Sequence, residues 1–410
     1  MNSEVWNSYF FSEFVQINPP VKLNNSREYS FVEMKDLNSN LKYVYPSTTR
    51  KPSSGSRFQN SDTLFARITP CLENGKICQV NGLEDGVGFG STEFLVFRGK
   101  EGVSDTDFIY YLSRFEKVRK FAESNLIGTS GRQRVTWEAF DNLQLTIPDL
   151  PTQRRIAEIL AALDDKIELN RQTNATLEAV AQAIFKEWFV DFNYPGATGE
   201  MVESELGLIP KGWHVGLLGE ISETIDCLHS KKPERQNDNT GYLLLQLWNI
   251  LDSGHLDTSN PYWISEKDYK KWITRIEAVE GISVITNVGR VGVSARIPAA
   301  VRSALGRNMT AISVKHDFPY DVYLILLLKS ETMAQEIENK TDPGTIMDSL
   351  NVRNVPLLRF VHPPVEVVNS FERVVKPLWV KADENIHESA MVAEIRDALL
   401  PKLMNGEIAL

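Results

Sequence analysis

Two arginines and a glutamine surround a glycine in one short polar stretch, Ser130-Gly131-Arg132-Gln133-Arg134. An arginine can donate two hydrogen bonds to the edge of a guanine, and a glutamine pairs in the same way with an adenine. The glycine lets the backbone adopt turns that other residues resist. We therefore expect Ser130, Arg132, Gln133 and Arg134 to contact bases or phosphates. The alternative is an exposed basic loop that binds nothing.

Other loops carry similar side chains in both halves of the chain. Cationic and amide groups on loops suit contacts with phosphates and with base edges. In the first half the candidates are Arg67, Asn74 and Lys76. In the second half they are Arg290, Arg307, Asn308 and the basic cluster Lys231, Lys232 and Arg235, for which a solvated surface loop is the alternative.

Catalytic motifs are weak in this sequence. Asn18-Pro19-Pro20-Val21 is similar to the Asn-Pro-Pro-aromatic motif of amino-methyltransferases, but valine replaces the aromatic residue that stacks on a flipped base. A loop after a short strand is the favoured interpretation. Cys71 and Cys78 lack a nearby histidine and do not have zinc-ligand spacing. We expect no catalytic residue, cofactor site or metal site in this chain.

The composition, with 42% hydrophobic and 24% charged residues, is typical of soluble globular proteins. Three cysteines and the lack of a signal-type start predict a cytoplasmic location. The longest apolar run, Val322 to Leu328, is shorter than the roughly 20 residues that span a bilayer, so no membrane contact is expected. The net charge of −10 leaves nucleic-acid binding open, because binding depends on where the charges lie.

An internal repeat divides the chain into two halves. The stretch WNSYFFSEF (6–14) matches WHVGLLGEI (213–221), and YSFVEMKDL (29–37) matches YLLLQLWNI (242–250). FIYYL (108–112) then matches YDVYL (320–324). The common order and the nearly constant offset of about 210 residues predict two homologous halves with one fold. Within them, 108–121 and 321–337 are the predicted helices.

A long heptad pattern follows a proline-marked junction at the end of each half. Apolar and small polar residues alternate at spacings of four and three, with one misfit at Arg396. The predicted seams are Ile156, Leu160, Leu163, Ile167, Asn170, Asn174, Leu177, Ala181, Ile184, Trp188 and Phe371, Val375, Leu378, Ala382, Asn385, Ser389, Val392, Arg396, Leu399, Leu403. The two helices should pair, with the polar seam positions fixing their register. Packing of each helix on its own globular domain is the alternative.

The predicted fold class is therefore α+β: two homologous mixed α/β domains separated by a long antiparallel two-helix coiled coil. The expected segments are 1–150, 151–195, 196–362 and 363–410. Aromatic residues crowd the end of the first helix, at Phe185, Trp188, Phe189 and Phe192. Because aromatic residues are enriched in interface cores, we expect them to dock a partner protein, with packing on the second domain as the alternative.

The stretch from Leu150 to Phe192 resembles the central conserved region of type I restriction-modification specificity subunits. Further similar stretches are 129–148, 206–221 and 395–408. The resemblance implies a non-catalytic subunit with two target recognition domains that bind double-stranded DNA. It also implies two DNA methyltransferase subunits that carry S-adenosylmethionine, and restriction/translocase subunits that use ATP and Mg²⁺. The family's Gly-Lys pair is kept as Gly75-Lys76 but becomes Gly292-Val293, and Gln153 lacks a clear counterpart near Val365.

Each recognition domain is thus expected to read one half of a split DNA target for methylation and phage defence. A duplicated-domain protein-protein scaffold that reads no DNA is the alternative. A solitary methyltransferase is disfavoured because the sequence lacks a glycine-rich cofactor loop after a strand.

Overall fold

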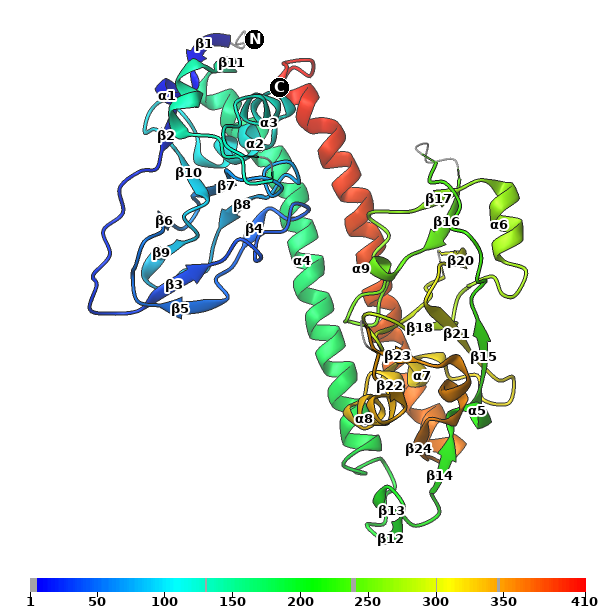
Figure 1. Ribbon diagram of the computed structural model, residues 1–410. Helices are drawn as coiled ribbons and strands as arrows, with labels where there is room; N and C mark the ends of the chain where they lie inside the picture. Colours follow the sequence, from blue (N-terminus) through cyan, green and yellow to red (C-terminus); the bar gives the residue numbers. More distant parts are fainter. Residues whose placement is uncertain (1–5, 130, 237–240, 300, 345–346) are drawn as a thin grey trace. The chain divides into compact units, whose positions relative to one another are not determined.

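The computed structural model describes residues 6–129, 131–236, 241–299, 301–344 and 347–410. The chain forms two compact units: Met1–Leu169 together with Met391–Leu410, and Asn170–Ala390. Each unit combines a globular part with segments of two long helices, drawn in green and red in Figure 1. Within the described ranges, no helix has the length and apolarity to cross a membrane. The four segment boundaries expected from the sequence stay a prediction.

The first unit contains three sheets, whose strand orders are β2-β10-β7-β8-β4, β5-β3-β9-β6 and β1-β11. Its elements are β1 (Trp6–Phe10), α1 (Phe11–Phe14), β2 (Val15–Ile17), β3 (Tyr29–Val32), β4 (Tyr43–Val44), β5 (Thr48–Arg50), β6 (Ser56–Gln59), β7 (Thr63–Ala66), β8 (Ile77–Val80), η1 (Glu84–Gly86), β9 (Val87–Gly90), β10 (Phe94–Gly99), α2 (Thr106–Arg114), α3 (Glu116–Ser124), η2 (Trp137–Asn142) and β11 (Gln144–Pro148).

The second unit has the corresponding strand orders β15-β21-β18-β19, β17-β16-β20 and β14-β24, and two small hairpins, β12-β13 and β22-β23. Its elements are β12 (Met201–Ser204), β13 (Gly207–Pro210), β14 (His214–Leu217), α5 (Leu218–Ile221), β15 (Ser222–Asp226), β16 (Tyr242–Leu245), η3 (Leu247–Asn249), β17 (Trp263–Ile264), α6 (Glu266–Trp272), β18 (Ser283–Thr286), β19 (Ser294–Arg296), β20 (Ser303–Leu305), β21 (Met309–Val314), α7 (Asp321–Leu328), α8 (Glu331–Asn339), β22 (Thr341–Asp342), β23 (Ser349–Leu350), η4 (Val352–Leu357) and β24 (Arg359–His362).

The strand orders confirm that the two halves share one fold. In both units the first central strand pairs in parallel with a later one, β3 with β9 and β16 with β20. The repeat preserves a glutamate that makes the same hydrogen bond in both units. The Glu13 carboxylate accepts the Phe10 N–H at 2.9 Å, and the Glu220 carboxylate accepts the Leu217 N–H at 3.1 Å. These bonds satisfy a backbone donor where the strand turns into the short helix.

The predicted helices at 108–121 and 321–337 are each interrupted. The first is α2 followed by α3, because Phe115 takes an extended conformation (φ −60°, ψ 133°) between them. The second is α7 followed by α8, where the Ser330 side chain accepts the Met333 N–H and caps the second helix. The apolar run at 322–328 lies in α7, whose residues are all buried in the core of the second unit.

The long helices are α4 (Leu150–Phe189) and α9 (Val365–Met404), each of 40 residues, or about 60 Å at 1.5 Å per residue. Their predicted antiparallel pairing is confirmed within each unit. In the second unit, Asn385 donates to Asn174 at 2.8 Å, and Asn170 donates to the Asn385 carbonyl at 3.3 Å. In the first unit, Ile156 and Leu160 share a core cluster with Leu403.

Arg396, the misfit in the heptad pattern, has a buried partner. Its guanidinium lies 2.6 Å from the Asp164 carboxylate of α4, and both side chains are almost fully buried. A buried charge is tolerated only when it is paired and hydrogen-bonded. The seam of the first unit is therefore polar at this level, which the heptad pattern alone could not explain.

Glu372 of α9 is a buried carboxyl that accepts the Tyr323 N–H at 2.7 Å. Burial raises the pKa of Glu372 from 4.5 to about 7. The folded-state pKa of Glu372 lies above its unfolded value. The contribution of the protonated carboxyl to the free energy of unfolding is therefore fully present below pH 4.5 and is lost as the pH rises through 7. We expect Glu372→Gln to become more stable relative to the wild type between pH 5 and pH 8, by up to about 3 kcal/mol.

Denaturant unfolding of both proteins at the two pH values measures this difference. Glu366→Gln, the same change at an exposed position of α9, is the matched control and should follow the wild type. Parallel pH profiles for the wild type and Glu372→Gln would contradict the prediction.

Candidate nucleic-acid interface

Three segments that are distant in sequence meet at the end of β7 in the first unit. The Arg67 N–H donates to the Glu93 carbonyl at 3.0 Å, and the Val135 N–H donates to the Arg67 carbonyl at 2.9 Å. The loop after β7, the start of β10 and the basic loop are thereby joined through their backbones. We call this set of segments the first rim (residues 67–76, 91–93, 127–129 and 131–135).

Arg134 is held by Glu93 at the first rim. Its guanidinium donates to both carboxylate oxygens at 2.7 to 3.0 Å, and this hydrogen bonding raises the pKa of Arg134. Arg67 forms a longer ion pair with the same carboxylate, at 3.9 Å. Glu93 was not among the sequence candidates, because an isolated acid before a strand gives no signal. It orients Arg134 and neutralises part of the local positive charge.

Arg132 is the exposed cation of the basic loop. The structure gives it no ion pair among the described residues, although its carbonyl accepts from Arg134 at 3.2 Å. Gln133 is fixed through its backbone, since its N–H donates to the Thr69 hydroxyl at 3.0 Å. Gly131 has a φ of 81°, a conformation that favours glycine. Ser130 lies outside the described residues.

Asn74 is exposed on the turn after β7, whereas Lys76 is engaged inside the unit. The Lys76 ammonium donates to the Met34 carbonyl at 2.8 Å. The repeat relates this carbonyl to that of Leu247, to which Arg290 donates at 3.4 Å, with a second bond to Ile250 at 2.9 Å. Both cations hold the turn after the first central strand, so the structure supports a structural role for Lys76 instead of a ligand contact.

The second unit has an equivalent rim around Asn287. The Asn287 N–H donates to the Asn308 carbonyl, and the Leu350 N–H donates to the Asn287 carbonyl, both at 2.8 Å. Arg307, beside Asn308, is exposed. We call this set the second rim (residues 287–292, 307–308 and 347–350). Arg290, Arg307 and Asn308 therefore lie in neighbouring segments.

A cationic and aromatic cluster adjoins the turn that Arg290 holds. The Lys232 ammonium lies over the ring of Tyr262 at 4.0 Å and over that of Trp248 at 5.2 Å. Burial, together with the nearby Arg235, lowers the pKa of Lys232. Arg235 donates to Asn260 at 2.7 Å, and the Trp248 side chain is 46% exposed. Lys231 is exposed on the same loop. Exposed aromatic rings beside cations can stack on bases and pair with phosphates.

Two further interpretations of the sequence concern residues whose contacts lie within the chain. Asn18 lies in a loop after β2, as predicted. Its side chain accepts the Val96 N–H at 3.0 Å. Phe185 and Phe189 are buried in the core of the second unit, and the expectation that they dock a partner protein stays a prediction. Trp188 and Phe192 pack against the same core, and the ring centroids of Trp188 and Phe371 lie 5.9 Å apart. Their apolar area stabilises this unit, which is the alternative weighed above.

One group in the described residues, Asp226, Cys227 and His229, places three metal-ligand atoms within 4.8 Å of one another. His229 lies 2.8 Å from Asp226, and Arg275 donates to the same carboxylate at 3.3 Å. The carboxylate therefore has two protein partners of its own. The expectation that the chain has no metal site stays a prediction.

The fold shared by the two units, with a polar rim at equivalent strand ends, is similar to that of DNA specificity proteins. Residues 4–179 match the family described as type I restriction modification DNA specificity domain. The chain is 25% identical to the HindI specificity subunit of Haemophilus influenzae, over 85% of this chain and 87% of that protein. It is 26% identical to the MjaIX specificity subunit of Methanocaldococcus jannaschii, over 75% and 70% of the two chains.

A crystal structure of the S subunit of a type I restriction-modification system from M. genitalium has the same fold. It aligns with a TM-score of 0.54 and 13% identity, over 98% of this chain and 97% of that one. These matches make the chain similar to the specificity subunits of type I restriction-modification systems.

Substitution of Arg132 and of Arg134 tests the first rim. We expect Arg132→Ala and Arg134→Ala each to weaken binding of the specific site by about 1 to 3 kcal/mol if the side chain reads a guanine. A phosphate contact would instead weaken binding of all sequences alike and make the salt dependence shallower. Titration of specific and random DNA at several salt concentrations separates the two roles. Arg27→Ala, an exposed cation paired with Asp85, is the control, and unchanged binding in both rim variants would exclude the rim from the interface.

Proposed function

We propose that each unit reads one half of a bipartite DNA target. The observation that carries this proposal is the repetition of one backbone rim with different side chains. Arg67, Glu93 and Arg134 of the first unit correspond to Asn287, Asn308 and Ser349 of the second, as their matching backbone hydrogen bonds show. Equivalent frames with different donors and acceptors suit the reading of two different base sequences.

Affinity and specificity would come from different side chains. Exposed cations such as Lys231 and Arg307 are placed to contact phosphates, which gives binding that falls with salt. Oriented groups such as Arg134 are better suited to base edges, because a fixed guanidinium loses little freedom on binding. The net charge of −10 is compatible with this division, since many cations away from the rims are paired with acids.

The same chain would act as the scaffold of the complex. We propose two methyltransferase subunits and the restriction/translocase subunits as its protein partners, with S-adenosylmethionine, ATP and Mg²⁺ bound by those partners. The helix segments of the first unit expose Leu169, Met391 and Ile395, which are 50 to 58% accessible. Exposed apolar side chains on a helix surface are candidates for a protein contact. Gel shifts with random DNA, with and without a methyltransferase partner, distinguish a DNA reader from a protein scaffold.

The isolated chain should bind no S-adenosylmethionine, because its proposed role is recognition alone. Calorimetric titration of the purified chain with the cofactor checks this expectation, with the assembled methyltransferase complex as the positive control. A saturable heat of binding to the chain by itself would contradict a non-catalytic role.

The helix pair would set the number of unread base pairs between the half-sites. One heptad inserted between Asn170 and Asn174, with a second between Asn385 and Ser389, keeps each seam on its face and adds roughly 10 Å. At about 3.4 Å per base pair, the extended protein should methylate the same half-sites with a gap longer by about three base pairs. Methylome sequencing of cells that express each protein with its partner measures the gap. An unchanged gap, or altered half-site bases, would show that the helix pair does not set the gap between the half-sites.

A further inference from the structure

Lys42 and His255 are buried basic side chains that no rim uses. Lys42 lies in the segment after β3, and His255 lies in the matching segment after β16. The two are one position apart in the backbone frame, because the Gln79 N–H donates to the Lys42 carbonyl and the equivalent Arg296 N–H donates to the Gly254 carbonyl. Lys42 is 3% exposed and His255 is fully buried. Burial of such groups is costly, which points to a specific arrangement around each of them.

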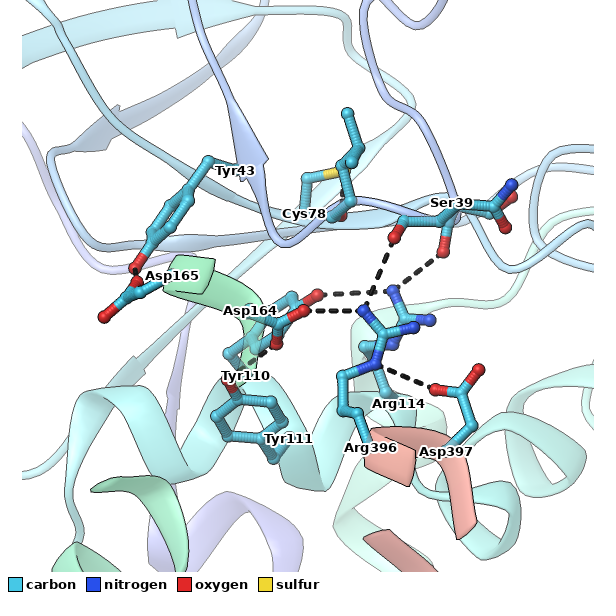
Figure 2. A network of polar contacts seen from close by, with 12 residues as sticks. Ser39, Tyr43, Cys78, Tyr110, Tyr111, Arg114, Asp164, Asp165, Arg396 and Asp397 are labelled. Atoms are coloured by element: carbon cyan, nitrogen blue, oxygen red, sulfur yellow. Dashed lines mark hydrogen bonds and ion pairs between the residues drawn. The ribbon is translucent and has the colours of Figure 1, made fainter. Parts of the chain in front are cut away.

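In the first unit, Lys42 belongs to a cluster that reaches both long helices. Its ammonium lies over the rings of Tyr43, Tyr110 and Tyr111, at 5.0 to 5.8 Å. The Tyr111 hydroxyl donates to Asp164 of α4 at 2.7 Å, and Arg396 of α9 donates to the same carboxylate (Figure 2). The globular part, α4 and α9 therefore meet at one buried carboxylate.

The segment just before β4 is tied to this cluster as well. The Arg396 guanidinium also donates to the Asn40 carbonyl at 3.4 Å, and Arg114 donates to the Ser39 carbonyl at 2.8 Å (Figure 2). The Tyr43 hydroxyl donates to Asp165 of α4 at 2.6 Å. We call Lys42, Tyr111, Asp164 and Arg396 the first clamp.

In the second unit, His255 reaches the helices through different side chains. Its Nδ1 lies 2.6 Å from Asp383 of α9, and its Nε2 lies 3.6 Å from Glu178 of α4. The ring stacks on Trp379 at 4.3 Å, and Arg296 of β19 also donates to Asp383, at 3.2 Å. We call His255, Glu178, Trp379 and Asp383 the second clamp.

Polar clamps restrict geometry more than apolar contacts do. Two apolar surfaces can slide with little change in buried area, whereas a buried carboxylate that accepts two charged or hydroxyl donors loses them when the elements shift. A buried ion pair adds little net stability compared with an apolar pair of similar volume. The presence of such a polar cluster after the first central strand of both units therefore indicates a role in orientation.

We propose that the two clamps are positioning elements that fix the angle of each recognition domain on the helix pair, and so determine how strictly the gap between half-sites is measured. This inference rests on the proposed bipartite reading. A domain whose angle on the helices can vary would accept gaps that are one base pair longer or shorter than the preferred gap. The half-site bases would stay the same, because the rims are not altered.

The test uses the chain assembled with its methyltransferase partner, and DNA substrates whose gap changes one base pair at a time. The first variant, Tyr111→Phe, removes one hydroxyl from the first clamp. The second, Asp164→Leu with Arg396→Met, replaces the buried ion pair by apolar side chains, a change that buried pairs often tolerate. Glu116→Gln, which breaks an exposed ion pair with Lys120 of the same unit, is the control.

We expect the ratio of methylation rates, preferred gap over a gap longer by one base pair, to fall roughly fivefold in Tyr111→Phe and about tenfold in the double variant. The control should keep the wild-type ratio. Folded variants with the wild-type ratio, or with altered half-site bases, would overturn the clamp inference while the bipartite reading stands. If the double variant does not fold, Tyr111→Phe decides alone. A wild type that is indifferent to the gap, or that recognises no split target, would instead remove the proposed function.

Discussion

The packing of α4 against α9 is the contact on which both units depend. Neither helix can bury its seam alone, and each unit takes a segment of both. The seam is not uniformly apolar: it contains the Asn170, Asn174 and Asn385 cluster in the second unit and the Asp164–Arg396 pair in the first. Polar groups in such a seam oppose slippage, since a shift by one turn would leave them buried without partners. Register is thereby specified at some cost in stability.

The globular parts show how one fold can present two different surfaces. The backbone contacts around Arg67 recur around Asn287, while the side chains carried by that frame differ. Hydrogen bonds of the main chain and apolar core contacts hold the frame, so rim side chains can vary without unfolding it. Glu93 adds a further constraint in the first unit, because its carboxylate pairs with the Arg134 guanidinium and holds it in one orientation. An acid within a candidate DNA surface is thus compatible with DNA binding.

Each globular part is attached to the helices by different residues of matching segments. Lys42 among tyrosine rings and His255 on Trp379 both bring a basic group from the segment after the first central strand to the helix surface. The matching segments keep a contact with the helices but use a basic residue one position apart. An aromatic surface accommodates either cation or imidazole, which explains how the site could diverge while the domain stayed attached.

The sequence by itself determined the duplication, the paired long helices and the resemblance to type I specificity subunits, because heptad spacing and repeated motifs are local patterns that survive without knowledge of contacts. It also identified several of the loops that form the rims, but not the segments 91–93 and 347–350. Only the tertiary structure decided which members of those loops are available: Lys76 is engaged by Met34, and Arg134 by Glu93. It likewise showed that Phe185 is core and that Arg396 belongs in the seam. These outcomes depend on partners far away in the chain, and the free energy of a buried charge or ring is set by the neighbours that folding brings to it.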